Sequence, residues 1–210
     1  NGEESTVGVM SSMKVGPTIA DDIKSASYFA VIGSLLVVFL YILFRFRRWQ
    51  FSLGAVAAVF HDVLIILGVF SLCRNIMPFS MEIDQAFIAA ILTVVGYSLN
   101  DTVVVFDRIR EYFNEHKTWP FSRTINAALN STISRTINTS LTTLIVLLAI
   151  FIFGGDSIRG FMFALIIGVI VGTYSSLFIA TPIMYDTAKN KSEDLLAKKE
   201  EETEEGEEVI

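Results

Sequence analysis

The stretch AFIAAILTVVGYSLNDTVVVFDRIR, residues 86 to 110, decides the fold class because its first 21 residues are almost entirely apolar. A helix rises about 1.5 Å per residue, so about 20 apolar residues cross the roughly 30 Å hydrocarbon core of a membrane. We therefore predict a spanning helix over residues 86 to 106. Its exceptions are informative too, since Tyr97, Asn100 and Asp101 interrupt the apolar run.

Four further segments have the same length and character, at residues 28 to 46, 51 to 73, 133 to 153 and 161 to 184. Of the 210 residues in the chain, 52% are hydrophobic and only 18% are charged, which argues against a soluble globular protein. We predict an all-α integral membrane protein, with a five-helix transmembrane domain over residues 27 to 186. Residues 1 to 26 are then the end of an external domain and a connector, with a flexible end as the alternative.

The net charge of −6 belongs to a tail. Residues 193 to 210 hold nine acidic and two basic residues, whereas residues 1 to 192 hold 13 acidic and 14 basic residues. We predict an acidic, solvated tail over residues 187 to 210 and expect no nucleic-acid partner. The single cysteine, Cys73, excludes an internal disulfide, and with only two histidines we expect no protein-bound metal or other cofactor.

Five spans place the two ends of the transmembrane domain on opposite sides, and basic residues mark the cytoplasmic side. With the N-terminal end outside, the cytoplasmic segments carry 12 of the 16 basic residues. These are Arg45, Arg47, Arg48, Arg108, Arg110, Lys117, Arg123, Arg135, Lys189, Lys191, Lys198 and Lys199. We predict an external N-terminal end and a cytoplasmic C-terminal end.

The segment between the third and fourth spans is long enough to have a structure of its own. Within residues 119 to 132, Phe121, Ile125 and Leu129 recur at helical spacing, with polar residues between them. This pattern predicts either an amphipathic helix on the cytoplasmic membrane surface or an extension of the fourth-span helix.

Ionisable groups inside a span are costly to bury and are therefore candidates for function. Asp101 lies one to two turns from the cytoplasmic end of its span, with Tyr97 on the same face and Asn100 beside it. Arg135 lies at the cytoplasmic end of the fourth span, in the same half of the membrane as Asp101, and is followed at helical spacing by Thr139. A membrane carboxylate with a movable cationic partner is what a proton relay requires. The alternative for Arg135 is a charge that only sets topology and extends to the interface.

Two other spans contain polar or small residues at their centres. In the second span, His61 and Asp62 point about 100° apart on a helix, so we expect them to address different neighbours within a polar network that locks helix packing. In the fifth span, Gly168 and Gly172 are one turn apart, which is typical of close helix packing.

Several motifs, in order along residues 15 to 185, carry a resemblance to a known family. They are Val15-Gly16-Pro17, Phe60-His61-Asp62-Val63, the run from Gly96 to Arg110, Ser134-Arg135-Thr136-Ile137-Asn138-Thr139-Ser140 and Gly172-Thr173-Tyr174-Ser175-Ser176. In these motifs the chain resembles the SecF half of the SecDF protein-export membrane proteins, within the resistance-nodulation-division (RND) superfamily. The resemblance implies the C-terminal five spans of an RND-type half-transporter.

The resemblance also implies a function. Members of the family act in the bacterial inner membrane beside a SecD half, with the SecYEG channel and the SecA motor, and use the proton or sodium gradient to promote polypeptide export. They are not enzymes. The ion-coupling positions of the family fall on Asp101, Arg135 and Thr139, and we expect His61, Asp62, Tyr97 and Asn100 to support them.

Two departures and three rival functions bear on this reading. The family's first span and most of its large external domain are missing, so we expect a C-terminal piece of a SecF or fused SecDF chain. The rivals are another proton-driven RND half that moves lipid or drug, and an assembly scaffold whose polar residues only specify packing. An intramembrane enzyme is disfavoured, because no nucleophile and base are suitably spaced.

Overall fold

The computed structural model describes residues 17–189, and the side chains of residues 29, 30 and 32–189. Within that part of the chain, all regular secondary structure is helical. Most of the expected external segment, residues 1 to 26, and of the expected acidic tail, residues 187 to 210, lies outside the described residues, as do Val15 and Gly16 of the first motif.

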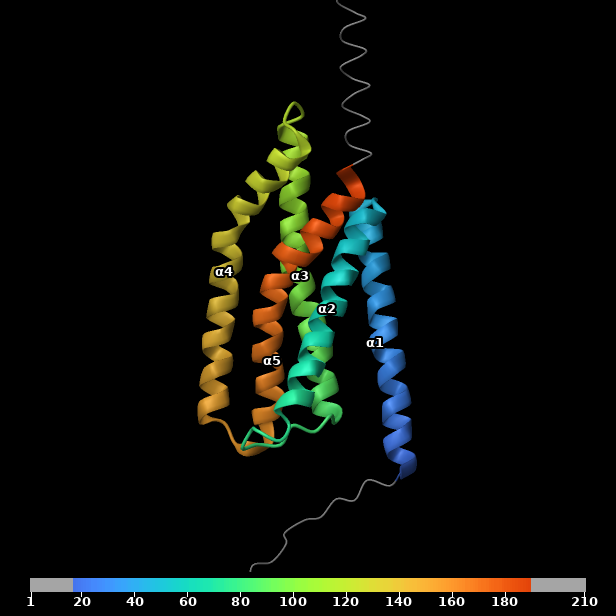
Figure 1. Ribbon diagram of the computed structural model, residues 1–210, viewed down its shortest axis with the longest axis vertical. Helices are drawn as coiled ribbons and strands as arrows, with labels where there is room; N and C mark the ends of the chain where they lie inside the picture. The colour runs from blue at the N-terminus through green and yellow to red at the C-terminus, as the bar shows by residue number, and fades with distance from the viewer. Residues whose placement is uncertain (1–16, 190–210) are drawn as a thin grey trace, which may run out of the picture.

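Five long helices follow one another, namely α1 (Pro17–Phe46), α2 (Trp49–Cys73), α3 (Gln85–Glu115), α4 (Phe121–Phe153) and α5 (Asp156–Ser175). A π-helical turn, η1 (Ser176–Ala180), continues α5 into a helix that ends at Lys189. Successive helices run in opposite directions, so the start of α1 and the end of α5 lie at opposite ends of the bundle (Figure 1). The predicted all-α fold with five helices is confirmed.

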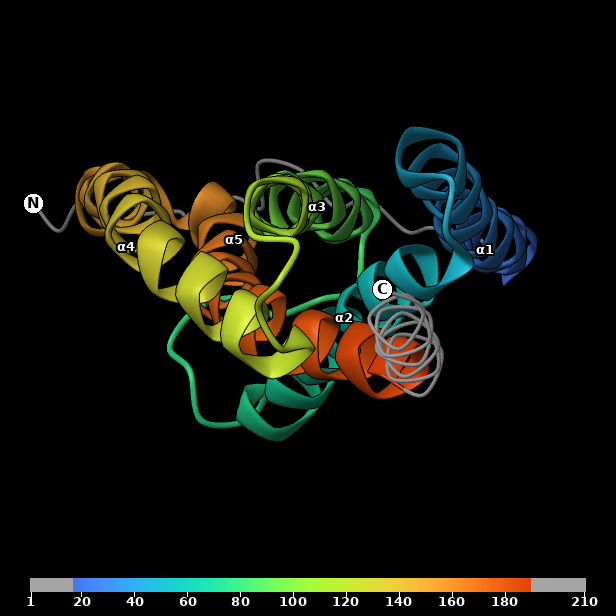
Figure 2. The same ribbon diagram turned by 90° about the horizontal axis from the view of Figure 1, so that it is seen from above.

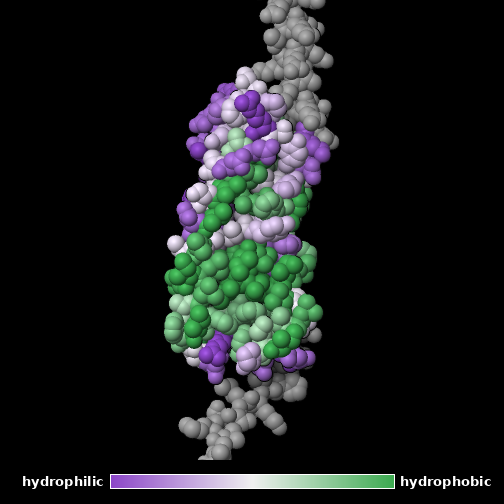
Figure 3. Space-filling model, turned by 60° about the vertical axis from the view of Figure 1, so that its left-hand side comes forward, coloured by the Kyte–Doolittle hydropathy of each residue, from purple (hydrophilic) through white to green (hydrophobic). Residues whose placement is uncertain are grey.

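The helices fit a membrane by length and composition. Among the described residues, four helices are long and apolar enough to cross it, and α1 adds a shorter apolar segment, Ile32–Phe46. Large apolar side chains such as Phe44 and Phe153, each 87% exposed, cover the outside of the bundle. The face of the bundle seen in Figure 3 carries a broad hydrophobic band with polar residues above and below it. The chain is a multi-pass membrane protein.

Local sequence explains where several helices begin and end. The Asp84 carboxylate caps α3 by accepting a hydrogen bond from the backbone N–H of Phe87 at 2.9 Å. The α1–α2 turn depends on Arg47, whose φ of 54° is left-handed and whose N–H donates to the Leu43 carbonyl at 2.8 Å. A left-handed residue of this kind commonly ends a helix, although glycine is the usual choice.

The segment between the third and fourth spans takes the second of the two expected forms. Residues 121 to 132 are the first turns of α4 itself, which runs unbroken to Phe153. Ile125 and Ala128 are buried in the protein, and the Phe121 ring stacks on Tyr185 at 5.2 Å. The apolar face of this segment therefore packs on the protein and not on lipid.

Three helices form the centre of the bundle. α2, α3 and α5 lie together, with α1 on one side and α4 on the other (Figures 1 and 2). α3 and α5 approach closely, because a Cβ atom at Gly168 would collide with Val94 and one at Gly172 would lie 3.1 Å from the Cβ of Ser98. The packing role predicted for these two glycines is confirmed.

The π-helical turn η1, which follows α5, is the one irregularity within the described spans. The Thr181 hydroxyl donates to the Ser176 carbonyl five residues earlier, at 3.1 Å. Against this turn lies Gly54 of α2, where a Cβ atom would collide with the Ala180 carbonyl oxygen. Turns of this kind often accompany functional sites. This one directly follows Ser175, whose hydroxyl donates a hydrogen bond to Asp62.

Candidate ion-coupling site

Asp101 is the centre of the site. Its side chain projects from α3 into the protein, where only 4% of the residue is exposed. Two side chains of α4 act on its carboxylate, namely the charge of Arg135 and the neighbouring hydroxyl of Ser140. Nevertheless, the Oδ2 atom is buried without a hydrogen-bond partner among the described residues. A buried carboxylate oxygen that lacks a donor is costly.

Arg135 lies close enough to influence Asp101 without forming an ion pair with it. Within residues 29 to 189, no acidic oxygen lies within 4.0 Å of the Arg135 guanidinium. The residue is exposed on α4 and lines a hollow of about 390 Å³ together with Asp107 and Glu111 of α3. Both of these carboxylates already have partners, because Asp107 pairs with Arg45 at 2.9 Å and Glu111 pairs at 2.6 Å with Arg108, which lines the same hollow.

The other predicted coupling residue, Thr139, keeps its hydrogen bond within its own helix. Its hydroxyl donates to the Arg135 carbonyl at 3.0 Å. Its neighbour Thr143 accepts a hydrogen bond from the Tyr97 hydroxyl at 3.3 Å, which links α3 to α4. Asn100 is exposed on the surface of α3. The structure thus brings Asp101 and Arg135 to the interface between α3 and α4, and it places Thr139 and Tyr97 along the same interface.

The second polar pair belongs to a separate cluster. Asp62 is 1% exposed, and its Oδ2 accepts hydrogen bonds from Ser98 of α3 at 2.6 Å and Ser175 of α5 at 2.8 Å. His61 Nδ1 lies 3.2 Å from Asp62 Oδ1. The expectation that His61 and Asp62 address different neighbours is wrong, because the imidazole contacts the adjacent carboxylate. Together the four residues join α2, α3 and α5.

Sequence reasoning missed the small hydroxyl residues that complete both clusters. Ser98 and Ser175 bind Asp62, while Ser140 lies beside Asp101 and forms a 2.6 Å hydrogen bond with Thr173 of α5. Thr136, one turn before Ser140, is buried with no partner for its hydroxyl among the described residues. Serine and threonine are common in packed membrane helices, so sequence alone does not distinguish these residues. The one signal is the helical spacing of Thr136 and Ser140 on the buried face of α4.

The surface beside the Tyr97–Thr143 bond is polar at membrane depth. Thr93 and Asn100 of α3 and Arg135 of α4 are all exposed there. A Cβ atom at Gly96, between Thr93 and Asn100, would meet nothing within 4 Å, so the described chain leaves open space at this point of α3. Exposed polar groups of this kind are expected to face protein or water and not lipid.

Between residues 17 and 189, no group of three or more histidine, cysteine, aspartate or glutamate side chains is placed to hold a metal ion.

Comparison with known proteins places this geometry in a family. The family model described as "Protein export membrane protein SecD/SecF, C-terminal" matches residues 2–190. The chain belongs to this SecD/SecF family. Within it, the chain is 58% identical to the protein translocase subunit SecF of Rhodothermus marinus over 172 residues, which are 82% of this chain and 56% of that protein. It is 44% identical to the protein translocase subunit SecDF of Brucella abortus over 170 residues, which are 81% of this chain and 22% of that protein.

A solved SecD/SecF structure shows the same arrangement. A crystal structure of SecDF in its super-membrane-facing form matches with a TM-score of 0.73 and 37% identity, covering 88% of this chain and 24% of that one. The match identifies the chain as the C-terminal, SecF portion of such proteins. It spans about half the length of the SecF relatives that it matches.

Proposed function

We propose that this chain is the membrane part of a SecF half that uses the proton gradient to promote protein export. The observation that carries the proposal is Asp101, a buried carboxylate with an unpartnered oxygen beside an arginine that is not bonded to it. The relatives are protein translocase subunits, which supports protein export as the process that is driven. The role is one of coupling and not of catalysis.

Protonation of Asp101 would weaken its attraction to Arg135. Arg135 would then be free to move into the hollow that Asp107 and Glu111 line, where it would compete with Arg45 and Arg108 for their carboxylates. α4 is the helix best suited to follow, since only 11% of its spanning window is buried, against 33% to 44% in the other three helices that can span. One charge that crosses 100 mV releases about 2.3 kcal/mol, within the range of typical coupling energies between conformational states.

The exposed polar strip on α3 and α4 is the surface that we assign to the SecD half. Thr93, Asn100 and Arg135 would then face a helix of that half, which removes them from lipid. The matching SecDF proteins carry both halves, in keeping with such a partner. The SecYEG channel, the SecA motor and the translocating polypeptide complete the proposed assembly.

The proposed location is the bacterial inner membrane, with the start of α1 on the periplasmic side. The charges support this orientation, because Arg45, Arg47, Arg48 and Arg110 lie at one end of the bundle and Arg159 near the other. Cys73, at the end of α2, gives the test: an impermeant maleimide should label it from the periplasmic side. Labelling only from the cytoplasmic side would reverse the orientation.

Replacement of Asp101 by asparagine in the complete protein tests the coupling role. The substitution keeps the size of the side chain and removes its titration, so stimulation of export by the proton gradient should disappear. The measurement is translocation into inverted vesicles that contain SecYEG and SecA, with and without an uncoupler, in sodium-free buffer.

The matched control is Asp156→Asn, an equal charge change at an exposed position of α5, outside the proposed site. It should lower export little, because its exposed ion pair with Arg159 stabilises weakly. Normal gradient-driven export by the Asp101→Asn protein would contradict the proposal. Loss of assembly in that variant would favour the scaffold alternative instead.

A further inference from the structure

A cavity of about 480 Å³ lies at the basic end of the bundle, away from Asp101. It is bounded by the α1–α2 turn, the last turns of α3, the start of α4 and the helix that follows η1. The volume is in the range of small-molecule binding sites. Its lining is amphipathic, with three arginines, Arg47, Arg48 and Arg110, and apolar side chains that include Phe113, Phe121 and Met184.

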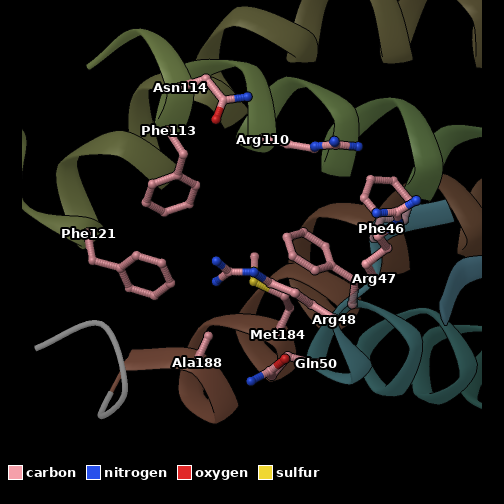
Figure 4. A pocket seen from close by; sticks show the side chains of 11 residues that line it. Phe46, Arg47, Arg48, Gln50, Arg110, Phe113, Asn114, Phe121, Met184 and Ala188 are labelled. Carbon is pink, nitrogen blue, oxygen red and sulfur yellow. The ribbon is translucent and has the colours of Figure 1, made fainter. Parts of the chain in front are cut away.

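The three arginines lack partners within the described part of the chain. Among residues with described side chains, none of the three forms an ion pair or a side-chain hydrogen bond, and no acidic residue lines the cavity. Their neighbours behave differently, because Arg45 pairs with Asp107 at 2.9 Å and Arg108 with Glu111 at 2.6 Å. Figure 4 shows Arg48 extending into the space between Phe121, Phe113 and Met184. A guanidinium directed into such a cavity is suited to an anion with planar or tetrahedral oxygens.

The backbone at Arg47 also points to a role for its charge. Its φ of 54° is a conformation that glycine adopts without strain and that a side chain with a Cβ atom seldom adopts. An arginine therefore occupies a position where the turn alone would favour glycine. The turn brings this positive charge to the rim of the cavity.

The depth of the cavity relative to the membrane indicates which kind of molecule carries the anion. It adjoins the turn at which the apolar segment of α1 ends and α2 begins, beside Trp49, which is 52% exposed. Tryptophan is enriched at the membrane–water boundary, where phospholipid headgroups lie. Basic cavities between membrane helices at this level bind the headgroups of anionic lipids.

We infer that the cavity binds the headgroup of an anionic phospholipid, with the phosphodiester on the arginines and the glycerol and first acyl carbons on Phe113, Phe121 and Met184. The acidic residues from Glu193 onward are also anionic and follow the helix that lines the cavity. They would satisfy the charge but not the apolar half of the lining. A glycerophospholipid matches both halves, and this assignment does not depend on the role of Asp101.

The test is native mass spectrometry of the full-length protein together with its partner half. The complex is first delipidated. It is then titrated either with short-chain phosphatidylglycerol or with phosphatidylcholine that has the same acyl chains. Phosphatidylglycerol should bind more tightly. Each arginine should contribute about fivefold in affinity, so Arg48→Gln with Arg110→Gln should weaken binding by roughly 25-fold. Arg47→Gly should weaken it about fivefold while it relieves the backbone, so poor folding would not explain the loss.

Arg123→Gln is the matched control, since it removes an arginine at the same end of the bundle but outside the cavity, stacked over Trp119 at 4.4 Å. It should leave phosphatidylglycerol binding unchanged. Equal affinity for the two lipids, or an equal loss in the control, would overturn the inference. So would binding that appears only after residues 193 to 210 are deleted, because the tail would then be the occupant. Full competition by glycerol 3-phosphate would show a free-anion site and would also contradict it.

Discussion

Asp62 and Asp101 are both aspartates buried within membrane helices, yet their surroundings differ. Asp62 has a partner on each oxygen, with Ser98 and Ser175 on one and His61 on the other. Asp101 has an Oδ2 atom without a partner among the described residues, and the nearest arginine is not bonded to it. Burial therefore does not distinguish a structural carboxylate from one that can change state, whereas the hydrogen-bond partners do.

Position in the bundle explains the difference. Asp62 lies where α2, α3 and α5 meet, so its hydrogen bonds break only if three packed helices separate. Asp101 faces α4, a flanking helix with a small buried share. A carboxylate between a packed core and a flanking helix can exchange partners at lower cost, because one helix moves and the others stay in place.

The largest expected effect is a difference between two identical substitutions. Asp101→Asn should abolish gradient-driven export, because protons can no longer be taken up at this position. Each proton that crosses a potential of 100 mV otherwise supplies about 2.3 kcal/mol. Asp62→Asn should retain it, because the amide oxygen still accepts from Ser98 and Ser175 while the NH₂ group faces His61. Export into inverted vesicles, normalised to the amount of assembled protein, measures both.

The opposite pattern would break the comparison. If the Asp62→Asn protein assembled normally but lost gradient-driven export, His61 and Asp62 would belong to the relay. Asp101 would then be the structural residue of the two.

The next effect concerns the close approach of α3 and α5 that holds the Asp62 cluster together. Gly168→Val would force its side chain into Val94 and should lower the free energy of unfolding by about 3 kcal/mol. Gly68→Val is the matched control on α2, since a Cβ atom there meets nothing within 4 Å. Thermal unfolding in detergent should separate the two variants, and equal stability would show that the contact adjusts freely.

A smaller effect is expected from Asp62→Ala. The substitution leaves the Ser98 and Ser175 hydroxyls without their acceptor, although the Ser175 hydroxyl also contacts the Gly172 carbonyl at 3.2 Å. Stability should fall by about 2 kcal/mol, whereas Ser175→Ala should cost about 1 kcal/mol. A loss below that of Ser175→Ala would mean that the cluster contributes little to packing.

The sequence predicts most of the fold because membrane spans depend on length and hydropathy alone. The five helices, their order and the close approach at Gly168 were all predictable. The extent of α3 was not, since Glu115 lies beyond the apolar run and the helix continues without a membrane to stabilise it. The π-helical turn after Ser175 was also missed, because it depends on the contact with Gly54 and leaves no local pattern.

The charged residues of the candidate site were predictable from the sequence. Asp101 and Arg135 are conspicuous because ionisable groups inside spans are rare. The partners of Asp62 were not predictable, since serines on α3 and α5 meet it only through tertiary packing. The contact between His61 and Asp62 also depends on a side-chain rotation that the 100° helical spacing does not reveal.

The smallest expected effect tests whether Tyr97 belongs with the movable carboxylate or with the fixed packing. Tyr97→Phe removes the 3.3 Å hydrogen bond to Thr143, whose own hydroxyl still donates to the Thr139 carbonyl at 3.0 Å. No buried donor is stranded, so stability should fall by only about 0.5 kcal/mol. A double-mutant cycle with Thr143→Val should give a coupling energy of the same size.

If export falls while stability changes this little, the tyrosine hydroxyl acts in coupling, as a temporary partner for Arg135 or as part of its path. If export is unchanged, the bond only holds α4 beside α3, and the ability to change partners is confined to Asp101 and Arg135.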